Sequence, residues 1–385
     1  MDPEIFKNSP TGSLAITEHS QFAFVPDELP PRGIQNDAII NRLSDANIQL
    51  GELKGAGRNF PNPYLLIRPL QRREAVASSN IEGTHTTLSD LFLLEAGASE
   101  AKRPPDTREV MNYVSALEYG IKALVDLPIS TRMITEMHRI LLSGLPKTRG
   151  GSIVPGEYKR NQNFIGGTTL STARFIPAPP QEMSRLMGNF ENFINSDLAL
   201  RMPALLLAAI THYQFEMIHP FPDGNGRVGR LLVPIILKHR GALDEPLLYI
   251  SPYIEERKDD YIAGLYNVSK TGDWNGWIDF FLQIIEKTCR NTIRTIQKLH
   301  DLNIEYLGKV QKARRSALLG KLIDWCFEVP YITIRGVEKY LDISYLSARN
   351  HIKTLEAAGI LSEYPYSKKP KIFVAWEIYE ILETM

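Results

Sequence analysis

The chain has 385 residues, with 44 Lys and Arg against 44 Asp and Glu, and it is 43% hydrophobic and 23% charged. This length predicts two or three domains, and the composition is that of an ordinary soluble globular protein. A net charge of zero excludes a globally basic surface for nucleic acid or for an anionic membrane. The two cysteines, Cys289 and Cys326, are too few for a disulfide scaffold or a cysteine-based zinc site.

The N-terminus and the longest apolar stretch bear on localisation. The chain begins MDPE, without the basic region and following apolar region of a signal peptide. The longest apolar stretch, residues 204–218, contains His212, Gln214 and Glu216 and is too short to span a bilayer. We therefore expect a cytoplasmic enzyme or regulator.

Apolar spacing predicts mostly helices in the first third of the chain. The first ~35 residues have weak periodicity and are expected to form an extended arm. Ser130 is well placed to cap a helix that carries Met133, Ile134 and Met137 on one face. The other expected helices cover residues 37–53, 65–77 and 107–124, with breaks at 55–63 and 102–105.

Residues 150–180 differ from the rest because they are rich in Gly, Thr and Pro. Two β-prone pieces, 158–165 and 173–176, flank Gly166 and Gly167, which predicts a hairpin. Helical spacing then resumes over residues 183–194, 203–218, 228–240 and 277–296.

The last ~70 residues predict a separate module. Short helices are expected over 317–327 and 335–341, and Ser344 can cap a third that ends before Gly359. Two β-prone pieces, 360–364 and 371–376, then form a hairpin. Three helices followed by a two-stranded wing are typical of a winged helix-turn-helix domain.

The densest chemical feature is the segment HPFPDGNGRVGR over residues 219–230. Pro220 disfavours the α conformation at His219, which is therefore expected where the preceding helix ends. Glycines allow close backbone approach to a ligand, and the amides at the start of the next helix favour phosphate. Arg227 and Arg230, three residues apart, can both project from that first turn. Asp223 is a hard oxygen ligand suited to Mg²⁺.

His219 has the reference pKa of a general base near neutral pH. Together with the phosphate-binding features, it predicts a nucleotide-phosphate site with a base at its mouth. A glycine-rich turn with an exposed histidine is the plain structural alternative.

Three other sites were compared with this interpretation. Residues 224–229 match the GxGxxG dinucleotide pattern, but the preceding segment has helical rather than strand spacing. A Walker A loop needs Gly-Lys-Ser/Thr, which is absent. His212 and His219 share a helix face and could bind a metal, yet no His-Glu-x-x-His pattern or nearby thiol supports it.

Residues 219–230 match the Fic signature H-x-F-x-[D/E]-G-N-G-R-x-x-R at every defined position, so the chain resembles the Fic family of protein adenylyltransferases. Further matching features are Gly156-Glu157-Tyr158, Pro179-Pro180 and Gly272-Asp273-Trp274. The resemblance implies a mainly α protein: a helical Fic core over 107–300 with a β-hairpin flap. An N-terminal helical region over 1–106 and a winged helix-turn-helix domain over 309–385 complete the expected organisation.

The resemblance also implies a role for each loop residue. His219 would deprotonate a Ser, Thr or Tyr hydroxyl of a target protein, which then attacks the α-phosphate of ATP. Phe221 would anchor the loop, and Asp223 would hold Mg²⁺. The nucleotide phosphates would be bound by the start of the following helix, through Gly224, Asn225, Gly226, Arg227, Val228, Gly229 and Arg230.

A second motif implies regulation. Ser78-x-x-x-Glu82-Gly83 matches the family's inhibitory motif, in which Glu82 would pair with Arg230 and displace the γ-phosphate. A lone glutamate near a helix end is otherwise usually a solvated surface residue. In some members this glutamate is linked to removal of AMP, which the sequence leaves open. The flap is expected to bind the target by strand addition, and residues 249–261 are expected to contribute to the adenine pocket.

Residues 309–385 carry 12 Lys and Arg against 9 Asp and Glu, a net charge of +3. The expected recognition helix would display Arg349, Asn350 and Lys353 to DNA. Protein contacts or a homodimer are the alternative use of this module. Two further functions stay open: a DNA-binding regulator whose Fic core senses nucleotide, and transfer of UMP or a phosphate moiety.

Overall fold

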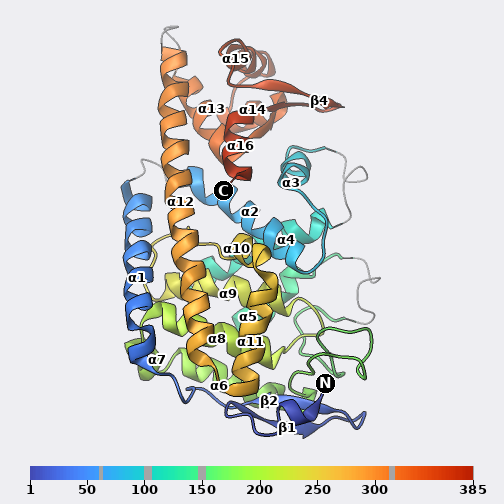
Figure 1. Ribbon diagram of the computed structural model, residues 1–385. Helices are drawn as coiled ribbons and strands as arrows, with labels where there is room; N and C mark the ends of the chain where they lie inside the picture. Colours follow the sequence, from blue (N-terminus) through green and yellow to red (C-terminus); the bar gives the residue numbers. More distant parts are fainter. Residues whose placement is uncertain (60–63, 99–105, 146–152, 312–316, 385) are drawn as a thin grey trace. The chain divides into compact units, whose positions relative to one another are not determined.

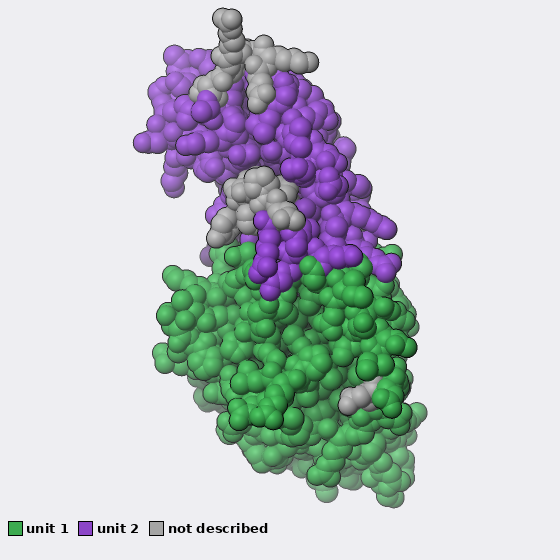
Figure 2. Space-filling model, turned by 90° about the vertical axis from the view of Figure 1, so that its left-hand side faces the viewer, with its two compact units in different colours: residues 1–51, 112–246, 253–287 green, residues 52–111, 247–252, 288–385 purple. Residues whose placement is uncertain are grey.

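The structure is a computed structural model that describes residues 1–59, 64–98, 106–145, 153–311 and 317–384. It is mainly helical with small antiparallel sheets, as the sequence predicts (Figure 1). The chain divides into two compact units, coloured separately in Figure 2. Unit 1 comprises residues 1–51, 112–246 and 253–287, and unit 2 comprises residues 52–111, 247–252 and 288–385.

The centre of unit 1 is a pair of packed helices, α8 (Ala204–Ile218) and α9 (Asn225–His239). All residues of α8 after the first are buried, because the helix is apolar on every side. Helix α6 (Met183–Ile194) packs on α8, and α5 (Thr131–Leu141) packs on α6 and α9. The bounds of α6 coincide with the predicted helix, and Ser130 caps α5 as predicted, because its side chain accepts a hydrogen bond from Met133 N–H.

Helix α12 (Trp274–Gln311) is a single helix of 38 residues that continues well past its predicted end at residue 296. It continues because Leu299, Leu302 and Tyr306 extend its buried stripe at helical spacing. The remaining long helices of the first part of the chain and of unit 1 are α1 (Asn36–Asn59), α4 (Thr107–Ala123) and α11 (Lys258–Thr271), with a short α7 (Asp197–Arg201).

The N-terminal arm is more ordered than the sequence predicts. After a short 3-10 turn, η1 (Pro3–Ile5), strands β1 (Gly12–Ile16) and β2 (Phe22–Pro26) pair antiparallel. Phe24 N–H donates to the carbonyl of Ile176, 2.8 Å away. The Phe24 ring lies 5.6 Å from that of Phe6 and 5.7 Å from that of Phe175. The arm is therefore part of the core of unit 1.

The predicted flap hairpin is mostly irregular backbone, so the expectation of two strands over 158–165 and 173–176 was wrong. A single isolated bridge joins Ile165 to Phe175. Gly166 and Gly167 do form the turn, with φ of 68° and 85°. The chain then enters η3 (Pro180–Glu182) and α6. The first residues of the predicted Gly-rich region, 150–152, lie outside the described residues.

Unit 2 contains the C-terminal module in the predicted order, with one strand and one helix more than expected. Its sheet has the order β3-β5-β4, with both pairs antiparallel. Strand β3 precedes the second helix, and the last helix follows the wing. The elements are α13 (Ala317–Glu328), β3 (Tyr331–Thr333), α14 (Ile334–Leu341), α15 (Tyr345–Ala357), β4 (Ser362–Lys368), β5 (Lys371–Val374) and α16 (Trp376–Glu383).

Helix α2 (Tyr64–Ile81), which ends at the predicted inhibitory motif, packs on α13 and α16 within unit 2. Its buried Glu74 accepts hydrogen bonds from the backbone N–H and the hydroxyl of Ser251, the first residue of α10 (Ser251–Glu256). Arg72 pairs with Glu95 at 2.8 Å, in the helix α3 (Leu88–Glu95) that follows. These polar contacts fix the position of α2 in unit 2.

No helix in the described ranges combines the length and the apolar character needed to cross a membrane.

The arm's role in the core can be tested on two phenylalanines of β2. Phe24 is fully buried, whereas Phe22 is 40% exposed. We expect Phe24→Ala to lower the free energy of unfolding by about 3–5 kcal/mol, because it leaves a cavity in the aromatic cluster. Phe22→Ala is the control, with an expected loss below about 1 kcal/mol. Equal losses in urea denaturation would show that the arm does not belong to the core.

Candidate active site

The candidate site lies where the chain reverses between α8 and α9. His219 ends α8 in the left-handed conformation, with φ 50° and ψ 59°, and its N–H donates to Phe215 O at 2.9 Å. The histidine therefore stands at the helix end, as Pro220 predicts. Gly224, with φ 80°, is the N-cap of α9. The helix itself starts at Asn225, three residues before the predicted start at 228. Left-handed backbone at both ends makes this reversal tight.

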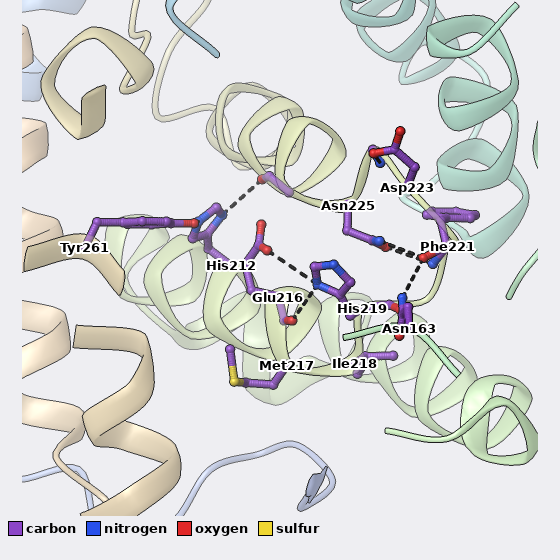
Figure 3. Close-up of polar contacts among 12 residues, drawn as sticks. Asn163, His212, Glu216, Met217, Ile218, His219, Phe221, Asp223, Asn225 and Tyr261 are labelled. Carbon is purple, nitrogen blue, oxygen red and sulfur yellow. Dashed lines mark hydrogen bonds and ion pairs between the residues drawn. The ribbon is translucent and has the colours of Figure 1, made fainter. Parts of the chain in front are cut away.

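The imidazole of His219 is held in one tautomer. Its Nδ1 lies 3.1 Å from the carbonyl oxygen of Glu216 and 3.9 Å from the carboxylate Oε2 of the same residue (Figure 3). A carbonyl oxygen only accepts, so Nδ1 carries the proton. In the neutral imidazole the lone pair is then on Nε2, and the side chain is 18% exposed. This is the state that a general base requires.

Asn225 holds the loop closed through its side chain. Its amide oxygen accepts from Phe221 N–H at 2.8 Å, and its amide nitrogen donates to Phe221 O at 2.7 Å. Phe221 is fully buried, as the predicted anchoring role requires. The Asn225 side chain was expected to help orient phosphates, whereas these two contacts give it a role in the loop itself.

His138, on α5, is part of the site although the sequence analysis did not identify it. Its ring stacks on that of Phe221, with centroids 3.8 Å apart and planes 6° apart. Gly156 N–H donates to its Nδ1 at 2.9 Å, so Nε2 carries the proton and donates to Asp223 O at 3.0 Å. Burial lowers the pKa of His138 to about 4, which keeps the ring neutral. The one sequence signal was a histidine on the apolar face of a predicted helix.

The two arginines of the loop are almost completely buried. Arg227 is 2% exposed and Arg230 is 1% exposed, both on the first two turns of α9. Arg227 Nη2 lies 3.3 Å from Asp223 Oδ1, which also accepts from Gly224 N–H at 2.6 Å. Two guanidinium groups are therefore buried at this helix start, where the helix dipole also favours anions.

Val228 and Gly229, also predicted to bind phosphate, serve the packing of α9. Val228 is fully buried, and its N–H donates to Gly224 O at 3.0 Å. A Cβ on Gly229 would lie 2.4 Å from Glu216 Oε1 and 3.3 Å from a ring carbon of Phe215, so a side chain here would require both residues of α8 to shift. The amides left for a ligand are those that precede the first helical hydrogen bonds, at Asn225 and Gly226.

His212 does not fit the alternative metal site with His219. Its Nδ1 donates to Gly229 O at 3.1 Å, and its Nε2 accepts from the Tyr261 hydroxyl at 2.8 Å. Both nitrogens are therefore used inside the core. Burial, together with the nearby charge of Arg230, lowers the pKa of His212 to about 3. The segment before the loop is helix α8, which also rules out a dinucleotide fold there.

Glu82 belongs to unit 2 and is the first residue after α2. Its N–H donates to Ser79 O at 3.0 Å, and Gly83 follows with φ 87°. Ser78, at the start of the motif, is fully buried. Within its own unit, the motif therefore forms the turn that ends α2.

The neutral state of His138 predicts a pH dependence of stability. Below pH 6.5 the unfolded chain binds a proton at this histidine, whereas the folded protein does so only near pH 4. Stability should therefore fall by about 3 kcal/mol as the pH drops through this window. In urea denaturation, His138→Gln should remove the part of this dependence due to His138 and retain the part due to His212, whose pKa is lowered further. An unchanged pH dependence in the variant would contradict the assignment.

Two family models match the chain. One, described as Fic/DOC family N-terminal, matches residues 40–122, and the other, described as Fic/DOC family, matches residues 128–237. Among curated relatives, "Protein adenylyltransferase Fic" of Drosophila yakuba is 28% identical over 283 residues, covering 73% of this chain and 52% of its own. The protein of the same name from Drosophila virilis is 30% identical over 288 residues, covering 73% and 53%. The chain thus spans about half the length of the curated relatives it matches.

A solved structure shares the fold. It is a Fic family protein from Desulfovibrio desulfuricans G20, with a TM-score of 0.57 at 20% identity, covering 90% of this chain and 98% of that one. The two ranges matched by the family models together span about half of the present chain. The chain belongs to the Fic/DOC family.

Proposed function

We propose that this protein transfers AMP from ATP to a Ser, Thr or Tyr hydroxyl of a target protein. The single observation that carries the proposal is the placement of His219. Its Nδ1 is bound to Glu216 O, and it lies directly before a helix start that bears two buried arginines. A base next to a phosphate cradle is the arrangement that nucleotide transfer to a hydroxyl requires. The names of the curated relatives support the same activity.

In the proposed reaction, His219 Nε2 takes the proton of the target hydroxyl as its oxygen attacks the α-phosphorus of ATP. A new P–O bond forms to the target, the bond from the α-phosphorus to the bridging oxygen breaks, and pyrophosphate leaves. The amides of Asn225 and Gly226, with Arg227 and Arg230, would bind the phosphate oxygens and stabilise their charge. Asn225 and Phe221 keep this cradle in shape through their mutual hydrogen bonds.

Asp223 fits a shared Mg²⁺. Its carboxylate is 44% exposed and offers the hard oxygen that Mg²⁺ prefers. Mg²⁺ is commonly held by one or two carboxylates together with substrate phosphates, rather than by a protein cage. Among the described residues there is no cluster of three His, Cys, Asp or Glu side chains that would form such a cage. Bound there, the ion would neutralise phosphate charge.

Two features of the target and nucleotide complete the proposal. The flap, with its bridge at Ile165, would hold target backbone, and residues 249–261 would contribute to the adenine pocket.

Transfer of UMP or of a phosphate moiety is the alternative within the same chemistry. We keep the division into regions 1–106, 107–300 and 309–385 as part of this proposal.

We further propose that Glu82 inhibits the reaction. The support is the Ser78–Gly83 motif, which matches the inhibitory motif of the family, and its place at the end of a firmly packed helix α2. A carboxylate competes with a phosphate for the same guanidinium, so the nucleotide would bind with its α-phosphate out of line. A role of Glu82 in AMP removal is compatible with the same position.

DNA binding by the C-terminal module is the second candidate function. Arg349, Asn350 and Lys353 are exposed on α15, and Lys369 and Lys371 are exposed at the wing turn. Cations and an amide on a recognition helix and wing are the groups that contact phosphates and base edges. A regulator of this kind would use the Fic core as a nucleotide sensor. A dimer contact through the same face is the alternative.

The enzyme proposal predicts a mass change. After incubation with ATP and Mg²⁺, Glu82→Gly should gain AMP ~10–100-fold faster than wild type. The substitution removes the carboxylate that competes with a phosphate for the guanidinium, and a charge-assisted hydrogen bond of this kind contributes about 1.5–3 kcal/mol. His219→Ala, alone or with Glu82→Gly, should gain none. Intact-mass spectrometry measures both. Equal rates for wild type and Glu82→Gly would contradict inhibition, and AMP transfer by His219→Ala would contradict the base.

The DNA proposal predicts a steep salt dependence. With about four phosphate contacts, the affinity for a duplex should fall ~10²-fold between ~50 and ~200 mM salt. The double variant Arg349→Ala/Lys353→Ala should flatten this slope, whereas Lys321→Ala, an exposed lysine on α13, should not. Fluorescence anisotropy measures each affinity. A salt dependence near zero for wild type would contradict DNA binding and favour protein contacts as the role of the module.

A further inference from the structure

Two residues at the base of the flap bind the backbone of the catalytic turn. Lys159 N–H donates to Pro220 O at 2.8 Å, and Lys159 Nζ lies 3.4 Å from Ile218 O. The Asn163 amide nitrogen lies 3.3 Å from His219 O and 2.9 Å from Phe221 O (Figure 3). Four consecutive carbonyl oxygens, at residues 218–221, thus accept hydrogen bonds from these two residues, and Phe221 O also accepts one from the Asn225 amide nitrogen.

The two side chains also bind each other. Lys159 Nζ donates to Asn163 Oδ1 at 2.7 Å, which leaves the Asn163 amide nitrogen directed at the turn. Lys159 is 3% exposed, and within the described part of the chain no carboxylate lies in ion-pair distance of it. Burial lowers its pKa well below the ordinary value. A buried amine without a counter-charge is costly, so its hydrogen bonds to Asn163 and to the turn have to offset that cost.

The backbone that they hold is strained. His219 has φ 50°, which is unfavourable for a residue with a side chain and persists only when its surroundings enforce it. The same backbone sets the direction of the imidazole, whose Nδ1 reaches back to Glu216 O. If the carbonyls of residues 218–221 lost their donors, the turn could relax and the imidazole would change its orientation.

We propose that Lys159 and Asn163 are positioning residues that fix the orientation and tautomer of His219. As an account of catalysis this rests on the proposed AMP transfer, although the state of the imidazole can be measured without it. Both residues contact the histidine side of the turn, whereas the phosphate-binding groups begin at Gly224. Their loss should therefore slow transfer and leave ATP binding unchanged.

Asn163→Asp separates positioning from folding. The aspartate keeps an acceptor for Lys159 Nζ but removes the donor to His219 O and Phe221 O. In the Glu82→Gly background we expect kcat for AMP transfer to fall ~10²-fold, with the Kd for ATP within about twofold. Lys159→Met should act in the same direction. Lys122→Met, an exposed lysine on α4, is the control and should leave both constants unchanged.

The second readout is ¹⁵N NMR of the histidine side chains, with the His219 signals assigned by their loss in His219→Ala. Wild type should show His219 protonated on Nδ1 alone, and Asn163→Asp should show a mixture of tautomers or a shifted titration. A wild-type imidazole protonated on Nε2, or an unchanged spectrum in Asn163→Asp, would overturn the proposal. If even Glu82→Gly transfers no AMP, the proposed function fails and the NMR result still decides the positioning role.

Discussion

Two helices buried along almost their whole length have to be joined without leaving the polar backbone of the joint unsatisfied. Helix α8 is buried from Leu205 to its end, and α9 packs on it with Gly229 at the contact. The short turn between them, residues 219–224, is buried at Pro220, Phe221 and Gly224, where an unpaired carbonyl or N–H is costly. Side chains supply the missing partners: Asn225 from within the loop, His138 from α5, and Lys159 and Asn163 from the flap base.

The same solution produces the chemical properties of the site. Because backbone contacts hold the turn, His219 keeps a left-handed conformation that presents Nε2 and ties Nδ1 to Glu216 O. Because α9 starts directly after the turn, its first amides and its two buried arginines face the same loop. The chain has no net charge, so the two cations at this site reflect the local sequence of the loop and not the overall composition. The contacts that satisfy the backbone of this turn are therefore the same contacts that hold the groups proposed to act in catalysis.

The local part of this arrangement was predictable from the sequence. Pro220 indicated that His219 ends a helix, and the apolar spacing of α6 predicted both of its bounds. The start of α9 was placed three residues late, because Gly224 and Gly226 are residue types typical of loops. The C-terminal module was predicted in its order of elements, since short helices and a Pro-turn hairpin are local features.

Contacts between distant segments were not predictable. His138 looked like one more residue on the buried face of α5, and nothing local shows that its ring stacks on Phe221, 83 positions later. The pairing of Lys159 and Asn163 with residues 218–221 depends on the path of the flap, whose two arms are irregular and joined by one antiparallel bridge. The order of the N-terminal arm escaped prediction for the same reason, since Phe175 and Tyr266, the aromatic partners of Phe6, lie far along the chain.

The central claim is that the site breaks the bond between the α-phosphorus and the oxygen that bridges it to the β-phosphorus, and transfers AMP to a protein hydroxyl. The most direct measurement is to incubate Glu82→Gly with Mg²⁺ and ATP labelled either at the α-phosphate or at the γ-phosphate, and to count the label that remains on denatured protein. The account predicts retained α-label, no retained γ-label, and neither in Glu82→Gly/His219→Ala. Retention of the γ-label would show phosphate transfer instead, and the absence of both labels from a protein that binds ATP would show a sensor without this activity.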